Sequence, residues 1–407
     1  MGQILLSQEV PSAPPAGKIA IYVDPADGNL KALSPDGSVD LLSPSGLRER
    51  NYLINPEFQF AQRQVPGTLT TYSSTTARVY AADRWAQVNS VASLQFKNVD
   101  TQGTALANLK ARFYGVYKQI TNPGKFVIFQ VLEGDDTAEL GGRTVRFQFK
   151  ARFGVTTAMT IHFGMLYLTA AGTIDVLPTT IASAFGVAGT NPTWGTNLAL
   201  IAPVLCESTG TLNAATSECS AVLSGAFQRF SATFVLPANV KNLIPVIWSD
   251  ALPVSNDEFH ISEAGLFDGT EIRDYYPRKP ADELLLCQRY YWKTFGLAVA
   301  PAQNAGATTG CITGPVGVAG ATALAWAVHV PFPVRMRVAP SAAVTGVTLY
   351  SPASAAAQSY NITQTVVQSS TVTTDNTDRG VNITATGGTG GTVGQIAGVH
   401  MTVDVDI

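Results

Sequence analysis

The residues Thr144-Val145-Arg146-Phe147-Gln148-Phe149-Lys150 alternate between polar and apolar side chains along their whole length. Because successive side chains of a β-strand point to opposite faces of a sheet, this period of two predicts a strand with one buried face. The pattern recurs before and after this stretch, at Leu109–Tyr117, Lys125–Val131, Ala158–Leu168, Gln228–Leu236, Asn242–Trp248 and Glu258–Phe267. Gly, Pro, Asn and Asp residues separate the repeats, so residues 47–274 are predicted to form a jelly-roll β-sandwich of antiparallel strands.

One long part of this domain does not follow the strand pattern. Pro178–Thr216 is rich in Gly, Ala and Thr, a composition that is typical of loops. We expect it to be an extended loop and not an element of the core.

A short helix is expected in a linker that covers residues 275–294. Asp282–Trp292 contains neither Gly nor Pro, follows Pro280 and starts with two acidic residues. Proline at the first helical position and acids in the first turn both favour the start of a helix. This linker separates the sandwich from the rest of the chain.

Residues 295–407 form a nearly uncharged C-terminal region. Strand-like alternation at Ser369–Thr374 and Val399–Val405 predicts a second β domain, similar to a sandwich. Its charged residues are Arg335, Arg337, Asp375, Asp378, Arg379, Asp404 and Asp406. A β domain that faces water on all sides normally carries more charge, so we expect this region to bury surface against other copies of the chain.

Residues 1–46 form a segment with two hairpin signals. The turn sequences Pro25-Ala26-Asp27-Gly28 and Ser34-Pro35-Asp36-Gly37 lie between short apolar runs. Asp-Gly favours tight hairpin turns because both residues tolerate a positive φ. Three strands of this length bury too little surface to be stable alone, so we expect the segment to dock onto a partner. The alternative is a loosely docked arm of the next domain.

Charge and hydropathy exclude two classes of partner. Of 407 residues 14% are charged and 46% are hydrophobic, and the net charge is −3. Nucleic-acid binding needs clustered Lys and Arg, so we expect no nucleic acid as a partner. No run approaches the roughly 20 apolar residues of a membrane-spanning helix, and we expect no membrane insertion.

The start of the chain and the cysteines indicate where the protein assembles. Residues 1–5 lack the basic segment and the apolar core of a signal peptide, which predicts assembly in the cytoplasm. Cys206, Cys219, Cys287 and Cys311 do not have the spacing of a zinc site. Because cytoplasmic thiols stay reduced, Cys206 and Cys219, which are close enough in sequence to close a loop, are expected to be free thiols.

Acidic residues are the main candidates for chemistry. Glu133, Asp135 and Asp136 lie together in the sequence, and Asp257 and Glu258 form a second acidic pair. Carboxylates bind a cation or, as a pair at suitable spacing, cleave a glycosidic bond. The alternative for the first cluster is a solvated turn between two strands.

No catalytic motif accompanies these acids. The sequence has no G-x-S-x-G around a serine and no H-E-x-x-H, which are common signatures of hydrolases. Each of the four histidines lies in a strand-like run, where a hydrogen-bonded structural role is commoner than catalysis. We therefore expect no enzymatic activity and no cofactor.

Tryptophan rings are candidates for sugar contacts, because apolar rings stack on sugar faces. Trp85, Trp248 and Trp326 are expected in the core. Trp194, in the loop Asn191-Pro192-Thr193-Trp194-Gly195, is the candidate for a surface ring that binds carbohydrate.

Three stretches have a distinctive mixture of residues: Asn51–Arg63, followed by Tyr80–Trp85, then Tyr276–Tyr291, and Val330–Pro340. They resemble tail-fibre and head-fibre proteins of tailed bacteriophages, and the first is similar to the start of the galactose-binding-like jelly roll of such fibres. The second, Tyr276–Tyr291, is similar to the segment that joins the jelly roll to the C-terminal domain. The third, Val330–Pro340, is similar to the strand that opens the core of that domain.

This resemblance implies a structural protein of the virion, a homotrimeric fibre or spike subunit assembled in the host cytoplasm. Residues 1–46 are then the attachment segment, which docks to the portal, neck, tail or capsid, and the β domains are expected to bind a glycan of the host surface. Two alternatives stay open. One is a tailspike depolymerase that cuts polysaccharide with the acids near Asp135, and the other is a carbohydrate-binding module of a secreted protein.

Overall fold

The computed structural model shows a mostly β chain in two compact units, Met1–Asn51 and Tyr52–Ile407. No helix within the described residues is long and apolar enough to cross a membrane. The boundaries expected at residues 46, 274 and 294 stay predictions. The structure describes residues 10–23, 30–37, 39–41, 50–72, 77–90, 94–104, 106–120, 124–154, 159–185, 190–208, 210–249, 256–304, 309–315, 317–319, 323–340, 346–352, 358–361, 367–372, 376–388 and 396–406.

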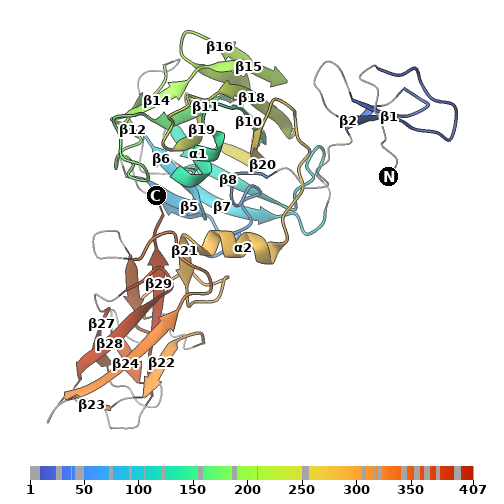
Figure 1. Cartoon of the computed structure of the whole chain (residues 1–407). Coiled ribbons are helices and arrows are strands. Elements are labelled where there is room, and N and C mark those ends of the chain that lie inside the picture. The colour runs from blue at the N-terminus through green and yellow to red at the C-terminus, as the bar shows by residue number, and fades with distance from the viewer. Residues whose placement is uncertain are drawn as a thin grey trace. The chain divides into compact units, whose positions relative to one another are not determined.

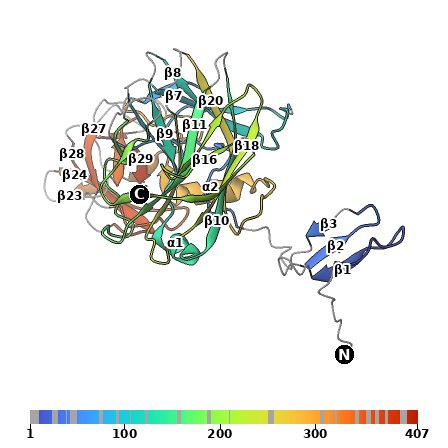
Figure 2. The ribbon, with the colours of Figure 1, turned by 90° about the horizontal axis from the view of Figure 1, so that it is seen from above.

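The first unit contains a three-stranded antiparallel sheet, whose strands lie side by side in Figure 2. They are β1 (Ala20–Val23), β2 (Leu30–Leu33) and β3 (Val39–Leu41). Between β2 and β3 the N–H of Gly37 donates to the carbonyl of Ser34 at 3.0 Å, and Gly37 has a φ of 85°. Glycine adopts this positive φ without steric cost. Both expected hairpins are present, although the turn at residues 25–28 lies outside the described residues.

The second unit begins with a sandwich of two antiparallel sheets (Figure 1). The seven-stranded sheet has, in spatial order, β15 (Pro203–Ser208), β18 (Gln228–Val235), β10 (Thr144–Phe153), β20 (Glu258–Asp268), β8 (Phe113–Gln119), β7 (Leu94–Asp100) and β4 (Thr70–Tyr72). The eight-stranded sheet has β16 (Thr211–Asn213), β17 (Glu218–Val222), β11 (Thr160–Leu168), β19 (Leu243–Ser249), β9 (Phe126–Phe129), β6 (Trp85–Asn89) and β5 (Val79–Ala82), with β14 (Leu198–Ile201) also paired to β11. The predicted mostly β sandwich fold is confirmed.

Alternate side chains of the two sheets fill the space between them, which we call the main core. Phe149 of β10 packs against Phe163 of β11 and Phe230 of β18, with ring centroids 5.3 and 5.6 Å apart. All three side chains are fully buried. Burial of one such side chain contributes about 1.5–3 kcal/mol. A shift of one residue would expose the whole apolar set of a strand, so the alternating pattern fixes the register.

A second hydrophobic core covers the other face of the eight-stranded sheet. Phe129 of β9 and Trp248 of β19 pack there with Leu177 and Ile181 of the segment that follows β11. The expectation that Pro178–Thr216 is a loop outside the core is therefore wrong. Its apolar residues have no regular period, which is why the sequence pattern does not reveal their burial. This segment also forms the two-stranded sheet of β12 (Ala182–Ala184) and β13 (Thr193–Trp194).

Two short helices belong to the second unit. Helix α2 (Pro280–Gln288) confirms the predicted helix, with proline near its start and acidic residues in its first turn. It ends before Trp292 because β21 (Tyr291–Lys293) pairs with a C-terminal strand. Helix α1 (Gly134–Leu140) occupies the place considered for a solvated turn. Gly134, Asp135, Asp136 and Thr137, the first four of its seven residues, are poor helix formers, so the sequence pattern does not indicate a helix here.

The C-terminal region forms one antiparallel sheet of nine strands, orange to red in Figure 1. In spatial order it has β21, β29 (Ile396–Asp404), β26 (Gln358–Asn361), β27 (Val367–Val372), β28 (Gly380–Gly388), β24 (Ala323–Pro331) and β23 (Gly317–Ala319), while β22 (Ile312–Pro315) and β25 (Val347–Tyr350) also pair with β29. Val399 and Met401 of β29 are fully buried and form a third core with Trp326 and Ile383. The β structure expected in this region is thus present, within the same compact unit as the sandwich.

The third phage-like stretch differs from its expected structure. Only Val330 and Pro331 of Val330–Pro340 belong to a strand, β24. After them the N–H groups of Phe332 and Met336 donate to carbonyl groups outside any strand, at 2.8 and 2.7 Å. The stretch contains three prolines, and proline cannot donate to a strand ladder, so a continuous strand does not form.

Candidate ligand-binding groove

A groove of about 680 Å³ lies on the outer face of the seven-stranded sheet, the face turned away from the main core. Lys150 of β10 and Arg229 of β18 are cross-strand partners on this face, because their neighbours Phe149 and Phe230 point into the main core. Cavities of a few hundred Å³ commonly hold small ligands. The lining residues are Asn108, Leu109, Lys110, Lys150, Phe227, Gln228 and Arg229.

A β-bulge in β20 holds one part of the groove in place. The register of β20 against β10 shifts at this point, and Glu263 has a φ of 50°. A bulge re-aims the side chain that it carries. The Glu263 carboxylate accepts from the backbone N–H groups of Lys110 and Ala111 and lies 2.9 Å from Lys150 Nζ. Lys150 also donates to the carbonyl of Asn108, so this buried pair fixes the loop onto the sheet.

An aromatic and charged cluster adjoins the groove at Phe227. Phe227 packs edge-to-face on Tyr114 at 5.7 Å, and Arg152 lies 5.0 Å from its ring centroid. Arg152 Nε donates to His260 Nδ1 at 3.1 Å, and His260 Nε2 lies 2.8 Å from the Glu258 carboxylate. Burial, opposed by Glu258 and assisted by Arg152, lowers the pKa of His260. Because arginine can only donate, the ring proton is on Nε2, and both nitrogens are occupied by structural contacts.

Positive charge is in excess around the groove. Asp274 Oδ2 lies 2.9 Å from Lys110 Nζ, and Asp274 Oδ1 lies 3.6 Å from Arg229 Nη2. The hydrogen bond from Lys110 lowers the pKa of Asp274. Three cations, Lys110, Lys150 and Arg229, line the groove, and the ion pairs to them come from two carboxylates, Glu263 and Asp274. The groove therefore carries one net positive charge.

Sequence reasoning did not identify any residue of this groove. The sequence indicates only that Lys150 and Arg229 each stand at a polar position of an alternating strand pattern, on the face away from the core. Their proximity depends on the pairing of β10 with β18, which are far apart in the sequence. The loop of Asn108 is held beside them by Glu263, whose side chain the bulge directs, and by the hydrogen bond from Lys150.

The stretches that resemble phage fibres meet at one junction between the sandwich and the C-terminal sheet. The N–H of Asn55 donates to Glu283 Oε1 at 2.5 Å, and Arg278 pairs with the same carboxylate at 3.0 Å. The N–H of Arg337 donates to the carbonyl of Arg289 at 2.9 Å, which connects the third stretch to the second. These stretches thus share a structural role.

Two arginines of the sandwich bind the C-terminal carboxylates at this junction. Arg63 Nη2 lies 2.9 Å from Asp404 and 2.6 Å from Asp406, and Arg84 Nη1 lies 2.7 Å from Asp406. Arg84 also lies 3.5 Å from the centroid of the Tyr290 ring. Burial acts to raise the pKa of Asp406, but the two arginines outweigh it and hold that pKa below its usual value.

The acidic candidates for a metal site do not act together. Both Glu133 oxygens contact Arg289, at 3.1 and 2.9 Å, and Tyr290 donates to one of them. Asp135 is exposed and lies with Asp136 in the first turn of α1. Among the described residues no group of three or more His, Cys, Asp and Glu side chains is placed to hold a metal ion. Glu133 is thus a junction residue, which corrects its grouping with Asp135 and Asp136.

Trp194 is only partly exposed. Its ring meets that of Trp248 edge-to-face at 5.3 Å and packs against the second core. Trp85, Trp248 and Trp326 are buried as expected. A sugar-binding role of Trp194 stays a prediction, restricted to the part of the ring that the core leaves open.

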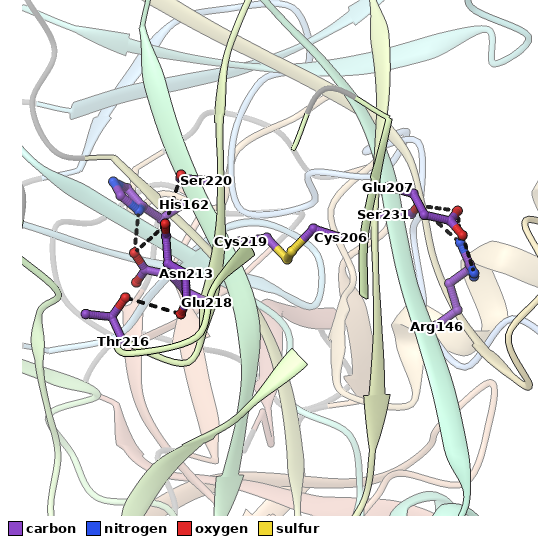
Figure 3. The surroundings of a disulfide bond; sticks show 10 residues. All are labelled: Arg146, His162, Cys206, Glu207, Asn213, Thr216, Glu218, Cys219, Ser220 and Ser231. Atoms are coloured by element: carbon purple, nitrogen blue, oxygen red, sulfur yellow. Dashed lines mark hydrogen bonds and ion pairs between the residues drawn. A yellow bond between two sulfur atoms is a disulfide. The ribbon is translucent and has the colours of Figure 1, made fainter. Parts of the chain in front are cut away.

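Cys206 and Cys219 form a disulfide, which corrects the expectation of free thiols (Figure 3). Cys206 lies in β15 of the seven-stranded sheet and Cys219 in β17 of the eight-stranded sheet, with Cα atoms 6.0 Å apart. The bond therefore joins the two sheets, as the chain crosses from one to the other. Sequence spacing alone does not show this crossing. On either side Figure 3 shows polar contacts, His162 with Glu218 and Arg146 with Glu207.

Comparisons with known proteins give partial similarities only. No protein-family model matches the chain, and no curated protein gives a significant match. A tailspike protein 4 enzymatically active domain from bacteriophage CBA120 matches 54% of this chain and 21% of its own length, at 9% identity and a TM-score of 0.30. The module TmCBM61 in complex with β-1,4-galactotriose matches 54% of this chain and 99% of its own, at 12% identity and a TM-score of 0.29.

A xylan-binding domain of the type CBM 22 matches 50% of this chain and 99% of its own, at 13% identity and a TM-score of 0.26. The chain thus spans about a fifth of the tailspike domain and nearly all of the two small modules. At such TM-scores these likenesses carry no argument about what the chain binds.

Proposed function

We propose that the chain is a non-enzymatic structural subunit of a tailed-phage particle, a fibre or spike that attaches through its N-terminal segment and binds a host glycan with its sandwich. The observation that carries the proposal is the junction. The stretches by which the sequence resembles phage fibre proteins, far apart along the chain, meet in one network that includes Asn55–Glu283 and the Arg337–Arg289 contact. A shared way of joining two β domains explains the resemblance.

The groove on the seven-stranded sheet supports the adhesive part of the proposal. It presents hydrogen-bond donors on the partly exposed side chains of Lys110 and Arg229, and the buried ring of Phe227 forms part of its wall. Ligand sites commonly use a few such polar groups to orient what they bind. The buried Lys150–Glu263 pair holds the groove in shape before a ligand arrives, which reduces the entropy lost on binding.

The adhesion can be tested with the purified chain and its host cells. Fluorescently labelled protein should bind cells that carry surface polysaccharide and should not bind mutants that lack it. Equal binding to both kinds of cell would contradict glycan adhesion. Release of reducing ends from the polysaccharide, lost in the double variant Asp135→Ala and Asp136→Ala, would contradict the non-enzymatic assignment and support a depolymerase.

A second candidate is a carbohydrate-binding module of a secreted protein. The Cys206–Cys219 disulfide favours it, because such bonds are typical of oxidising compartments. The two candidates differ in where the chain is found. A phage subunit copurifies with particles, whereas a secreted module stays in the soluble fraction.

A further inference from the structure

We infer that the groove selects saccharides that carry a carboxylate over neutral ones, an inference that rests on the proposed glycan adhesion. The whole chain has a net charge of −3. The groove nevertheless has three cations and only two carboxylates among its lining residues and their ion-pair partners. A site that carries a positive charge in an acidic protein attracts an anionic ligand and repels a cationic one.

The accessible cations are Lys110 and Arg229. The Lys150 side chain is 10% exposed and is held by Glu263 and by the carbonyl of Asn108. The Arg229 side chain is 31% exposed and the Lys110 side chain 53%. At 3.6 Å the contact of Arg229 with Asp274 is too long for a hydrogen bond. Its planar guanidinium is therefore available to bind a ligand carboxylate through two parallel hydrogen bonds.

Asp274 is an internal competitor of such a ligand. Its carboxylate lies against both accessible cations, where a ligand carboxylate has to bind. Half of its side chain is exposed, and exposed ion pairs contribute only about 0–1 kcal/mol. An incoming carboxylate can therefore replace it. Asp274→Asn removes the competing charge, so this variant should bind acidic saccharides more tightly and neutral ones unchanged.

Affinity electrophoresis of the full chain tests the selectivity. The gels contain bacterial capsular polysaccharides, some neutral and some built with uronic acids, and each acidic one is also used after chemical reduction of its carboxyl groups to alcohols. We expect an acidic polysaccharide to retard the chain and its reduced form to bind about tenfold more weakly, as expected for loss of a charge-assisted hydrogen bond. Arg229→Gln should weaken binding of the acidic form to a similar degree, and Asp274→Asn should strengthen it.

A matched control is Arg143→Gln, which removes an exposed arginine paired with Asp268 outside the groove lining. It should leave binding unchanged. Equal retardation by the native and reduced polysaccharides, or an effect of Arg143→Gln equal to that of Arg229→Gln, would overturn the inference and leave glycan adhesion standing. Equally strong retardation by dextran sulfate would also overturn it, because it would show general attraction to polyanions. Retardation by none of the polysaccharides would contradict both the inference and the adhesion.

Discussion

Glu57 makes the stability of the chain depend on pH near neutrality. Its side chain is buried and accepts a hydrogen bond from the N–H of Arg112 at 3.2 Å. Burial raises the pKa of Glu57 to about 7. The backbone hydrogen bonds of Phe113 and Arg112 act to lower this pKa, and the nearby carboxylates of Glu283 and Glu263 act to raise it. The folded chain therefore holds this proton more tightly than the unfolded chain does.

Glu57→Gln should remove this dependence. The pKa of Glu57 is about 7 in the folded chain and 4.5 in the unfolded chain. The bound proton therefore stabilises the fold fully below pH 4.5, and this stabilisation is lost as the pH rises to about 7. We compare the free energy of unfolding of the variant with that of the wild type at each pH. The variant-minus-wild-type difference should be larger at pH 8 than at pH 4, by roughly 3 kcal/mol. Guanidinium unfolding at both pH values measures this difference. Parallel changes in the two proteins would contradict the role of Glu57.

Asp406 is the residue on which the junction depends. It contacts both Arg63 and Arg84, and the Arg84 side chain is 2% exposed. Loss of one partner of a buried ion pair costs about 3–5 kcal/mol, so Asp406→Asn should lower the free energy of unfolding by about 3 kcal/mol. Urea unfolding measures the loss.

The control for this variant is Asp378→Asn, which affects the Arg335–Asp378 pair. The Arg335 side chain is 68% exposed, and exposed pairs contribute about 0–1 kcal/mol. A loss from Asp406→Asn no larger than that of the control would show that the buried charges do not stabilise the junction.

At the level of elements, the disulfide should hold β15 against the opposite sheet. Cys206 and Cys219 are 13 positions apart in the sequence. A disulfide that closes a loop of that size stabilises the folded state by about 3 kcal/mol, because it restricts the unfolded chain. The double variant Cys206→Ser and Cys219→Ser should lose about that amount. Calorimetry measures it, and thiol titration of the denatured wild type should find two free thiols, on Cys287 and Cys311. Four free thiols would contradict the bond.

Strands such as β10 and β20 were predictable because the apolar residues that face the main core alternate with polar ones along them. Thr144–Lys150 lies within β10, and the prediction at Glu258–Phe267 differs from β20 by one residue. The period of two is a local property, so it can be read from the chain. Helix α1 was missed because its first four residues have weak helix propensity, and burial of Thr137 and Leu140 supports it in the folded chain.

The groove and the disulfide were not predictable, since both depend on contacts between distant elements. Lys150 meets Arg229 only through the register of β10 and β18, and Glu263 reaches the loop of Asn108 only through a bulge. Cys206 and Cys219 belong to different sheets. Neither the spacing of the two cysteines nor the argument from a reducing compartment determines the path of the chain between the sheets.

At the level of the whole molecule, we predict a homotrimer with most of its subunit contact in the C-terminal region. Of the seven charged residues in that region, Asp404 and Asp406 are used at the junction, and Arg337 donates to the carbonyl of Val405. Few charges are thus left to solvate its surface. Sedimentation at micromolar concentration should show a species near three times 42.9 kDa, and a monomer would contradict the prediction. Val372→Asp in β27 should cause dissociation or insolubility.

The N-terminal segment should be separable from the rest of the chain. Met1–Asn51 forms its own compact unit, and the three short strands in it bury few apolar side chains among the described residues. Deletion of residues 1–46 should leave a folded oligomer that no longer enters particles. Circular dichroism and particle purification measure the two parts of this prediction. Normal incorporation of the shortened chain would place the attachment site elsewhere.

Immunogold electron microscopy of purified phage particles shows whether the chain is part of the virion. Antibodies raised against residues 52–407 should label an appendage of intact particles, and particles that lack the gene for this chain should carry no label. Unlabelled particles, with all of the protein in the soluble fraction, would contradict the assignment as a virion subunit and favour a secreted carbohydrate-binding module.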